Sequence, residues 1–326
     1  MKAVKRYLKD NLGILIALAA MILFLCVWPA TAKTFPTKTN LFNLLRQSST
    51  NLMLACGMTM VIILGGIDLS VGSIIAMSGC FAAGAVVWGG MPEIVGLTLG
   101  VLSGLMFGLF NGAVIAWTNI PPFIVTLASM NLAKGIAYVF SGGKPIRCMT
   151  EAWKFLGAGY VLGIPTPVWT MFIVFFLCVI FLNRTRIGRH IYAVGGNSTA
   201  AKFSGISTAK VKFTVFAISG TLAGLAGVTI ASRLYSGTCT SGNAAEMDAI
   251  AAVVIGGISM AGGKGKLVGV LFGALSYTII DKIIASLGVD ALINDTIKGT
   301  ILLLAVFIQI ILPVVRDKIK AARHEG

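Results

Sequence analysis

Val61-Ile-Ile-Leu-Gly-Gly-Ile-Asp-Leu-Ser-Val-Gly-Ser73 is the most informative stretch of this 326-residue chain. It places one acid, Asp68, beside two glycines and between two segments that are apolar enough to cross a bilayer. A carboxylate inside a membrane is costly unless it faces protein or water. A broken apolar helix is stable only where it packs on protein or lines a cavity. The stretch therefore predicts an interruption between two membrane helices.

A weaker copy of this stretch occurs late in the chain, as Val253-Val-Ile-Gly-Gly-Ile-Ser-Met-Ala-Gly-Gly263. The shared core is Gly-Gly-Ile, which begins at Gly65 and again at Gly256. Glycine-interrupted apolar segments in both halves of a membrane protein indicate a transport pathway. The candidates for lining or gating such a pathway are Gly65, Gly66, Asp68, Ser70, Gly256 and Gly257.

The composition is that of an integral membrane protein. Hydrophobic residues make up 57% and charged residues 11% of the chain, whereas soluble domains carry about 25% charged residues. The net charge of +15 falls in loops and at the chain ends, which argues against nucleic-acid binding. We predict an all-α, polytopic fold with about ten transmembrane helices, some short or broken, and a weak internal repeat. The expected spans are 11–29, 51–67, 70–88, 93–117, 122–140, 167–183, 213–231, 248–263, 267–287 and 297–315.

The distribution of basic residues predicts the orientation, because Lys and Arg gather on the cytoplasmic side. Ten spans place both termini on one side, and that side receives 16 of the 26 Lys and Arg residues. We therefore expect both termini to be cytoplasmic, together with a central loop at residues 184–212. On the opposite face, Lys144, Arg147 and Arg233 are candidates for docking an acidic partner.

Glycines at four-residue spacing in the fourth span predict a smooth helix face that allows a neighbouring helix to approach closely. They are Gly96, Gly100, Gly104, Gly108 and Gly112.

The sequence lacks the patterns of catalytic, cofactor and metal sites. Its nearest approach to a phosphate-binding loop, residues 258–265, lacks the leading glycine and the Ser or Thr after the lysine. The six cysteines have no metal-type spacing. Cys148 and Cys239 fall in loops expected on the outer face, where a disulfide between them is conceivable, and we treat both as free thiols. We therefore expect no enzyme activity, no cofactor and no metal in this chain.

Two hypotheses describe Asp68. Its carboxylate could cap the following helix by accepting N–H groups near Val71. It could instead line the pathway or form a gate salt bridge with a basic group. The predicted topology places Asp68 near the cytoplasmic end, which favours a gate over a solute-binding role.

The central loop has the features of a folded segment. Asn197 or Ser198 could cap a short helix that Gly205 would end. A short surface helix of small residues would suit the docking of a partner protein. Candidate docking residues are Gly195, Gly196, Asn197, Thr199, Ala200, Ala201, Ser204 and Gly205.

Thr199-Ala-Ala-Lys-Phe-Ser-Gly205 resembles the E-A-A-x-x-x-G signature by which permeases of ATP-binding-cassette (ABC) importers contact their ATPase. The chain departs from it at Thr199, where the signature has an acid. The I-x-L-P continuation is also missing, because Val215-Phe-Ala-Ile218 stands there.

Further strings extend the resemblance to most of the chain: Gly-Gly-Ile-Asp-Leu-Ser-Val-Gly, Ala-Val-Gly-Gly-Asn, Asp248-Ala-Ile-Ala-Ala-Val-Val-Ile-Gly-Gly257 and the following Ala-Gly-Gly-Lys-Gly-Lys. In this order they resemble the permease of ribose-type monosaccharide importers. The resemblance implies that residues 1–326 form one permease domain, in which residues 184–212 are the coupling loop. It implies a bacterial inner-membrane location, a permease dimer (homodimer or heterodimer), a cytoplasmic ATPase that uses ATP and Mg, and an extracytoplasmic sugar-binding protein.

The expected solute is a small neutral sugar, namely ribose or an aldose such as allose, galactose or xylose. An importer of another small molecule and an ion-coupled secondary transporter remain alternatives.

Overall fold

The computed structural model describes residues 12–118, 120–288, 293, 296–307 and 311, which are mostly helical. The helices are α2 (Leu12–Val27), α3 (Lys38–Ile63), α4 (Val71–Val87), α5 (Glu93–Trp117), α6 (Pro122–Ser141), α7 (Glu151–Ala158), α8 (Thr166–Arg184), α9 (Arg186–Gly196), α10 (Ser198–Phe203), α11 (Thr208–Arg233), α12 (Ala245–Ile255) and α13 (Leu267–Ser286). A further helical segment covers Thr296–Phe307.

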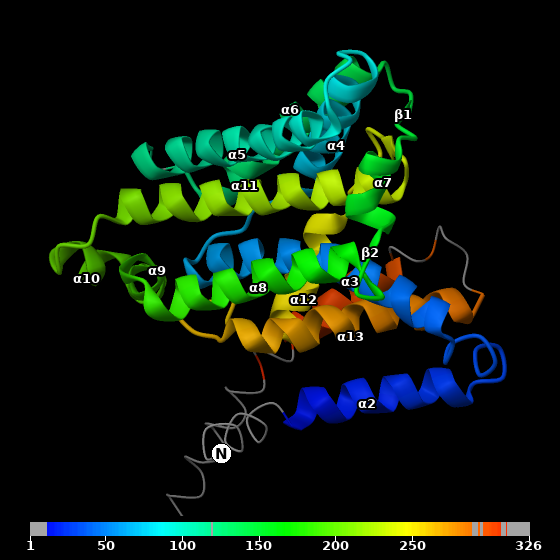
Figure 1. The fold of residues 1–326 in the computed structure, drawn as a ribbon. Helices are drawn as coiled ribbons and strands as arrows, with labels where there is room; N and C mark the ends of the chain where they lie inside the picture. Colours follow the sequence, from blue (N-terminus) through cyan, green and yellow to red (C-terminus); the bar gives the residue numbers. More distant parts are fainter. Residues whose placement is uncertain (1–11, 119, 289–292, 294–295, 308–310, 312–326) are drawn as a thin grey trace, which may run out of the picture.

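The long helices run side by side, with α4, α5 and α6 on one flank of the bundle and α2 on the other (Figure 1). Helix α11 packs against α5, α4 and α3, so it lies at the centre of the bundle. Helices α12 and α13 pack against each other and against α3, and α13 also contacts α2. One continuous cluster of buried apolar side chains extends from α3 to α13.

The two ends of the bundle differ. The end with α9 and α10, here called the basic end, carries the basic residues of 184–212 (Figure 1). The opposite end, here called the hairpin end, carries α7 and two small antiparallel sheets. In these sheets β1 (Ile146–Arg147) pairs with β4 (Ser236–Gly237), and β2 (Tyr160–Val161) pairs with β3 (Ile164–Pro165).

The predicted glycine face of α5 is confirmed, because all five of its glycines are buried. A Cβ atom added at Gly104 would lie 2.5 Å from the Gly220 carbonyl oxygen and 2.7 Å from the Gly224 Cα. One added at Gly108 would lie 2.5 Å from the Phe216 carbonyl oxygen. Helices α5 and α11 therefore touch backbone to backbone, as small residues allow in membranes.

The predicted helical, polytopic fold is confirmed in its main feature, since the described residues are mostly helical. Five described helices are long and apolar enough to cross a membrane, namely α5, α6, α8, α11 and α13. The count of ten spans stays a prediction, since the last span, 297–315, lies partly outside the described residues. Both termini also lie outside them.

The structure differs from the sequence-based expectation most clearly in two helix boundaries and one additional helix. Helix α3 begins at Lys38 rather than at 51, because the Thr37 hydroxyl accepts the Asn40 N–H (3.3 Å) and starts the helix in a polar stretch. Helix α12 ends at Ile255 rather than at 263. Residues 186–196, expected as loop, form α9, where the Thr185 hydroxyl accepts the Gly188 N–H (3.0 Å).

All six cysteines are free thiols. The β1–β4 register explains this for Cys148 and Cys239 at the hairpin end. The Cys148 N–H donates to the Tyr235 carbonyl (2.9 Å), so Tyr235 rather than Cys239 lies opposite Cys148.

Candidate functional site

The break between α3 and α4 is a hydrogen-bonded turn. Helix α3 ends at Ile63, and Gly65 has a φ of +89°. The Gly65 N–H donates to the Ile62 carbonyl and the Gly66 N–H to the Val61 carbonyl, both at 2.9 Å. This is the Schellman arrangement, which favours glycine at the left-handed position. The predicted interruption is therefore present at the predicted glycines.

Asp68 follows this turn and is only 1% exposed. Its Oδ1 accepts the Ser70 N–H (3.0 Å) and the Ser70 hydroxyl (2.6 Å), and its Oδ2 accepts the Ser219 hydroxyl (2.8 Å). The Asn111 amide donates to Ser70 Oγ (2.9 Å), and the Ser129 hydroxyl donates to Asn111 Oδ1. One hydrogen-bonded chain, here called the Asp68 network, thus joins the break and the start of α4 to α5, α6 and α11.

The partners of Asp68 bear on its two hypothetical roles. Within the described part of the chain, no Lys, Arg or His nitrogen forms an ion pair with Asp68. Ser70 is the N-cap residue of α4, and Asp68 accepts one backbone N–H, that of Ser70. The carboxylate is therefore held by hydroxyl and N–H donors, which supply the hydrogen bonds that a buried polar group requires.

The second glycine pair ends a helix with the same hydrogen bonds. Gly257 has a φ of +83°, its N–H donates to the Val254 carbonyl (2.9 Å), and the Ile258 N–H donates to the Val253 carbonyl (3.2 Å). Gly65 therefore corresponds to Gly257, one residue off the sequence match of Gly65 with Gly256. The shared feature is the helix end, and the wider internal repeat stays a prediction.

The predicted surface helix of the central loop is present as α10. The Asn197 side-chain oxygen accepts the Ala200 N–H (2.9 Å), so Asn197 is the N-cap residue. Gly205 follows the helix with a φ of +81°, and the Ile206 N–H donates a hydrogen bond to the Ala201 carbonyl (3.0 Å). Ala201 is packed inward at 5% exposure, whereas Phe203 is 89% exposed. Thr199 and Ala200 are exposed on this short helix, and Ser204 is exposed at its C-cap.

The segment that carries α10 touches the end of α3 directly. A Cβ at Gly195 would overlap the Ile63 carbonyl oxygen, so the two backbones are in contact. The Gly263 N–H donates to the same carbonyl oxygen (2.8 Å), and the Tyr192 hydroxyl donates to the Gly265 carbonyl (3.0 Å). Gly196, in contrast, has open space at its Cβ position. The surface segment therefore meets the last turn of α3, immediately before the break.

The basic candidates at the hairpin end differ in exposure. Lys144 and Arg147 are exposed, and Arg147 lies in β1. Arg233 is partly buried at the end of α11, where its backbone is in close contact with Gly157 of α7. Lys144 and Arg147 are therefore accessible to a partner, whereas Arg233 also packs within the bundle.

Of the residues in the Asp68 network, Ser70 was a candidate from the sequence, whereas Asn111, Ser129 and Ser219 were not singled out. Asn111 and Ser129 are polar residues inside apolar spans, which is a usable signal of internal hydrogen bonding. Ser219 carries no such signal, because small hydroxyl residues are ordinary in packed membrane helices. No group of three His, Cys, Asp or Glu residues that could hold a metal occurs in the described part of the chain.

Comparisons with known proteins agree with this architecture. Residues 40–306 match the family model described as "Branched-chain amino acid transport system / permease component". The chain belongs to this permease family.

Three curated relatives of the permease are sugar transport proteins. It is 40% identical to the ribose import permease protein RbsC of Escherichia coli K12, over 90% of this chain and 92% of that protein. It is 41% identical to the RbsC of Bacillus subtilis 168, over 82% and 84%. It is 35% identical to the xylose transport system permease protein XylH of Haemophilus influenzae, over 90% and 94%.

An ABC transporter solved in an inward-facing conformation covers 96% of the permease and 99% of its own chain, with a TM-score of 0.50 and 15% identity. This likeness concerns the fold alone.

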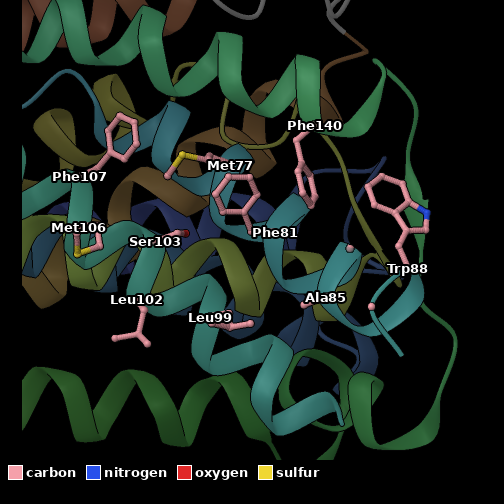
Figure 2. A pocket seen from close by; sticks show the side chains of 12 residues that line it. Met77, Phe81, Ala85, Trp88, Leu99, Leu102, Ser103, Met106, Phe107 and Phe140 are labelled. Atoms are coloured by element: carbon pink, nitrogen blue, oxygen red, sulfur yellow. The ribbon is translucent and has the colours of Figure 1, made fainter. Parts of the chain in front are cut away.

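A groove of 750 Å³ lies between α4, α5 and α6 of the permease, and it is almost wholly apolar. Figure 2 shows Phe81 near Phe140, with Trp88 at one end of the groove; the Phe81 and Phe140 ring centroids are 4.6 Å apart. On the α5 side, Leu102 and Met106 are 45% and 63% exposed. This lining suits hydrocarbon chains and offers few hydrogen-bonding groups to a polar solute.

The Asp68 network makes a testable contribution to stability. Replacing Ser219 with Ala leaves Asp68 Oδ2 buried without its hydroxyl donor, which should cost about 1–3 kcal/mol of unfolding free energy. The matched control is Thr214→Ala, an exposed hydroxyl on the same helix that bonds only its own helix backbone. Thermal unfolding of the detergent-solubilised permease measures both variants. Equal melting temperatures for the two would contradict a stabilising role for the network.

Proposed function

We propose that the permease is the membrane subunit of an ATP-driven importer for a small neutral sugar, ribose or a similar aldose, in the bacterial inner membrane. Its relatives named ribose import permeases are 40% and 41% identical over most of its length. The xylose permease relative supports an aldose as the solute class. In this proposal the basic end and both termini are cytoplasmic, in keeping with the positive-inside rule.

The observation that carries the proposal is the contact between the α9–α10 segment and the end of α3. Helix α10 presents Phe203 to solvent at the basic end, a fitting anchor for a partner subunit. The same segment meets the Ile63 carbonyl through Gly195 and lies against Gly263. A partner that displaces α10 therefore acts on the backbone at the end of α3, immediately before the break. The contact is made by backbone atoms of Gly195 and Ile63 rather than by flexible side chains.

The proposed assembly divides the work among several chains. A cytoplasmic ATPase binds α10 and hydrolyses ATP with Mg, so the permease itself has no catalytic role. A second permease chain completes the pathway. A sugar-binding protein delivers the solute at the hairpin end, where Lys144 and Arg147 are exposed. Exposed basic residues at such a rim accelerate the docking of an acidic partner.

Reconstitution tests the proposal. Proteoliposomes that hold the permease, its ATPase and its sugar-binding protein should accumulate radiolabelled ribose or xylose only with ATP inside. Vesicles with the permease alone and a proton or sodium gradient serve as the control. Gradient-driven uptake by the permease alone would replace the proposal with ion-coupled transport.

A substitution at α10 tests the docking of the ATPase. Phe203→Glu should abolish co-purification of the ATPase and leave the melting temperature unchanged, because this side chain is solvent-exposed. Leu162→Glu is the matched control, since Leu162 is 88% exposed at the opposite end of the bundle. ATPase retention by Phe203→Glu equal to that of Leu162→Glu would refute docking at α10.

Substitutions at two adjacent glycines test whether the contact between Gly195 and the Ile63 carbonyl couples the ATPase to transport. Gly195→Ala forces a Cβ against the Ile63 carbonyl, whereas Gly196→Ala places one in open space. We expect Gly195→Ala to lower ATP-driven uptake at least tenfold with the ATPase still bound, and Gly196→Ala to stay within twofold of wild type. Uptake assays in the reconstituted vesicles measure the difference. Similar uptake by the two variants would show that the contact does not transmit the ATPase cycle.

A further inference from the structure

A second cavity, of 160 Å³, lies between α4, α6 and the segment that leads into α12. Unlike the apolar groove, it has a lining that is about half polar. Six polar side chains reach it: Ser73, Asn131, Lys134, Ser241, Asn243 and Glu246. At about 30 Å³ per water molecule, the space holds roughly five waters, which is the scale of one small sugar.

The cavity lies deep in the membrane-spanning part of the bundle. Lys134 is about 18 Å along α6 from Pro122, at 1.5 Å per residue. A bilayer has a hydrocarbon core of about 30 Å, so Lys134 falls near its middle. Glu246 is in the first turn of α12, beside Gly72 in the first turn of α4. Lys134 therefore lies within the membrane-spanning part of α6, and Glu246 lies beside the first turn of α4.

Charged groups at this depth indicate a water-filled space. Asn131 and Lys134 are exposed on α6, and Asn243 is exposed on the segment opposite. Within the described residues, neither Lys134 nor Glu246 forms an ion pair shorter than 4.0 Å, although the two charges interact electrostatically. A lysine facing lipid at mid-membrane is strongly disfavoured. This face of α6 therefore faces water or protein rather than lipid.

The lining matches an uncharged polyol. The Lys134 ammonium donates hydrogen bonds, the Glu246 carboxylate accepts them, and the Asn131 and Asn243 amides do both. Asn131 gives one N–H to the Leu127 carbonyl (3.2 Å), which leaves its oxygen and second N–H for a ligand. Each sugar hydroxyl both donates and accepts. The single positive and single negative charge balance, so the cavity favours no net charge in its occupant.

We propose that this cavity is a subsite for an uncharged polyol in transit, which rests on the proposed function and names where the solute is held. The start of α4 forms one wall. A Cβ at Gly72 would overlap Glu246 Oε2 and lie 2.5 Å from the Gly242 carbonyl oxygen. Ala244, which also lines the cavity, has a φ of +60°, a conformation that costs energy in a residue other than glycine. Movement of the first turn of α4 therefore reshapes the subsite.

The test uses the full complex in proteoliposomes and measures sugar imported per ATP hydrolysed at saturating loaded binding protein. Asn131→Leu and Lys134→Met should each lower this ratio at least tenfold and leave ATP hydrolysis within twofold of wild type. Lys33→Met, at an exposed lysine outside the bundle, is the matched control and should change neither. The conservative variant Asn131→Gln should recover at least half of the wild-type ratio.

The outcomes separate the subsite from the proposed function. Absence of ATP-driven uptake in the wild type overturns the proposed function itself. Normal wild-type uptake with Asn131→Leu and Lys134→Met ratios within twofold of it overturns the subsite alone. Loss of permease dimers or of bound ATPase in these variants, measured by light scattering and co-purification, also overturns the subsite, because the residues would then act in assembly.

Discussion

Burial of the Asp68 carboxylate, which has no counter-ion among the described residues, organises the centre of this permease. Asp68 is 1% exposed, and its donors are hydroxyl and N–H groups. An unsatisfied buried carboxylate would be strongly destabilising, so those donors must stay in place. Ser219 comes from α11, and Ser70 is held by Asn111 of α5, which in turn is held by Ser129 of α6. Satisfying Asp68 thereby fixes the break between α3 and α4 against three other helices.

This constraint places a short stretch of chain in contact with both the surface and the interior. At one side, the Ile63 carbonyl meets Gly195 and Gly263 at the basic end. At the other side, Gly72 meets Glu246 and the Gly242 carbonyl at the polar cavity. Between them, the Schellman turn and the Asp68 network leave few free torsions. In the proposed importer, a displacement of α10 would reach this stretch through the contact between Gly195 and the Ile63 carbonyl.

Local sequence patterns were sufficient to predict the features that depend on interactions between residues close together in the chain. The glycine pair at Gly65, the Asn197 cap with Gly205, and the smooth face of α5 all appear as predicted, since each depends on residues a few positions apart. The hydrogen bond from Ser219 to Asp68 joins residues 151 positions apart. Its formation depends on how α11 packs, which no local pattern encodes. Helix α9 was missed for another reason: its basic face and modest apolarity have the composition of a loop.

In the proposed importer, the polar cavity also explains why a pathway for sugar can have few groups that bind the solute. A solute that must leave again cannot be held by many groups at once, because conduction requires binding that is favourable yet easily reversed. A cavity that opens to the surface at Asn131, Lys134 and Asn243 surrounds its occupant only partly. The cavity can replace part of the hydration shell of a polyol, but it cannot enclose the whole molecule. High affinity and strict selection of the sugar would then reside in a separate binding protein, and the two balanced charges of the permease would serve mainly to keep the pathway hydrated and open to neutral solutes.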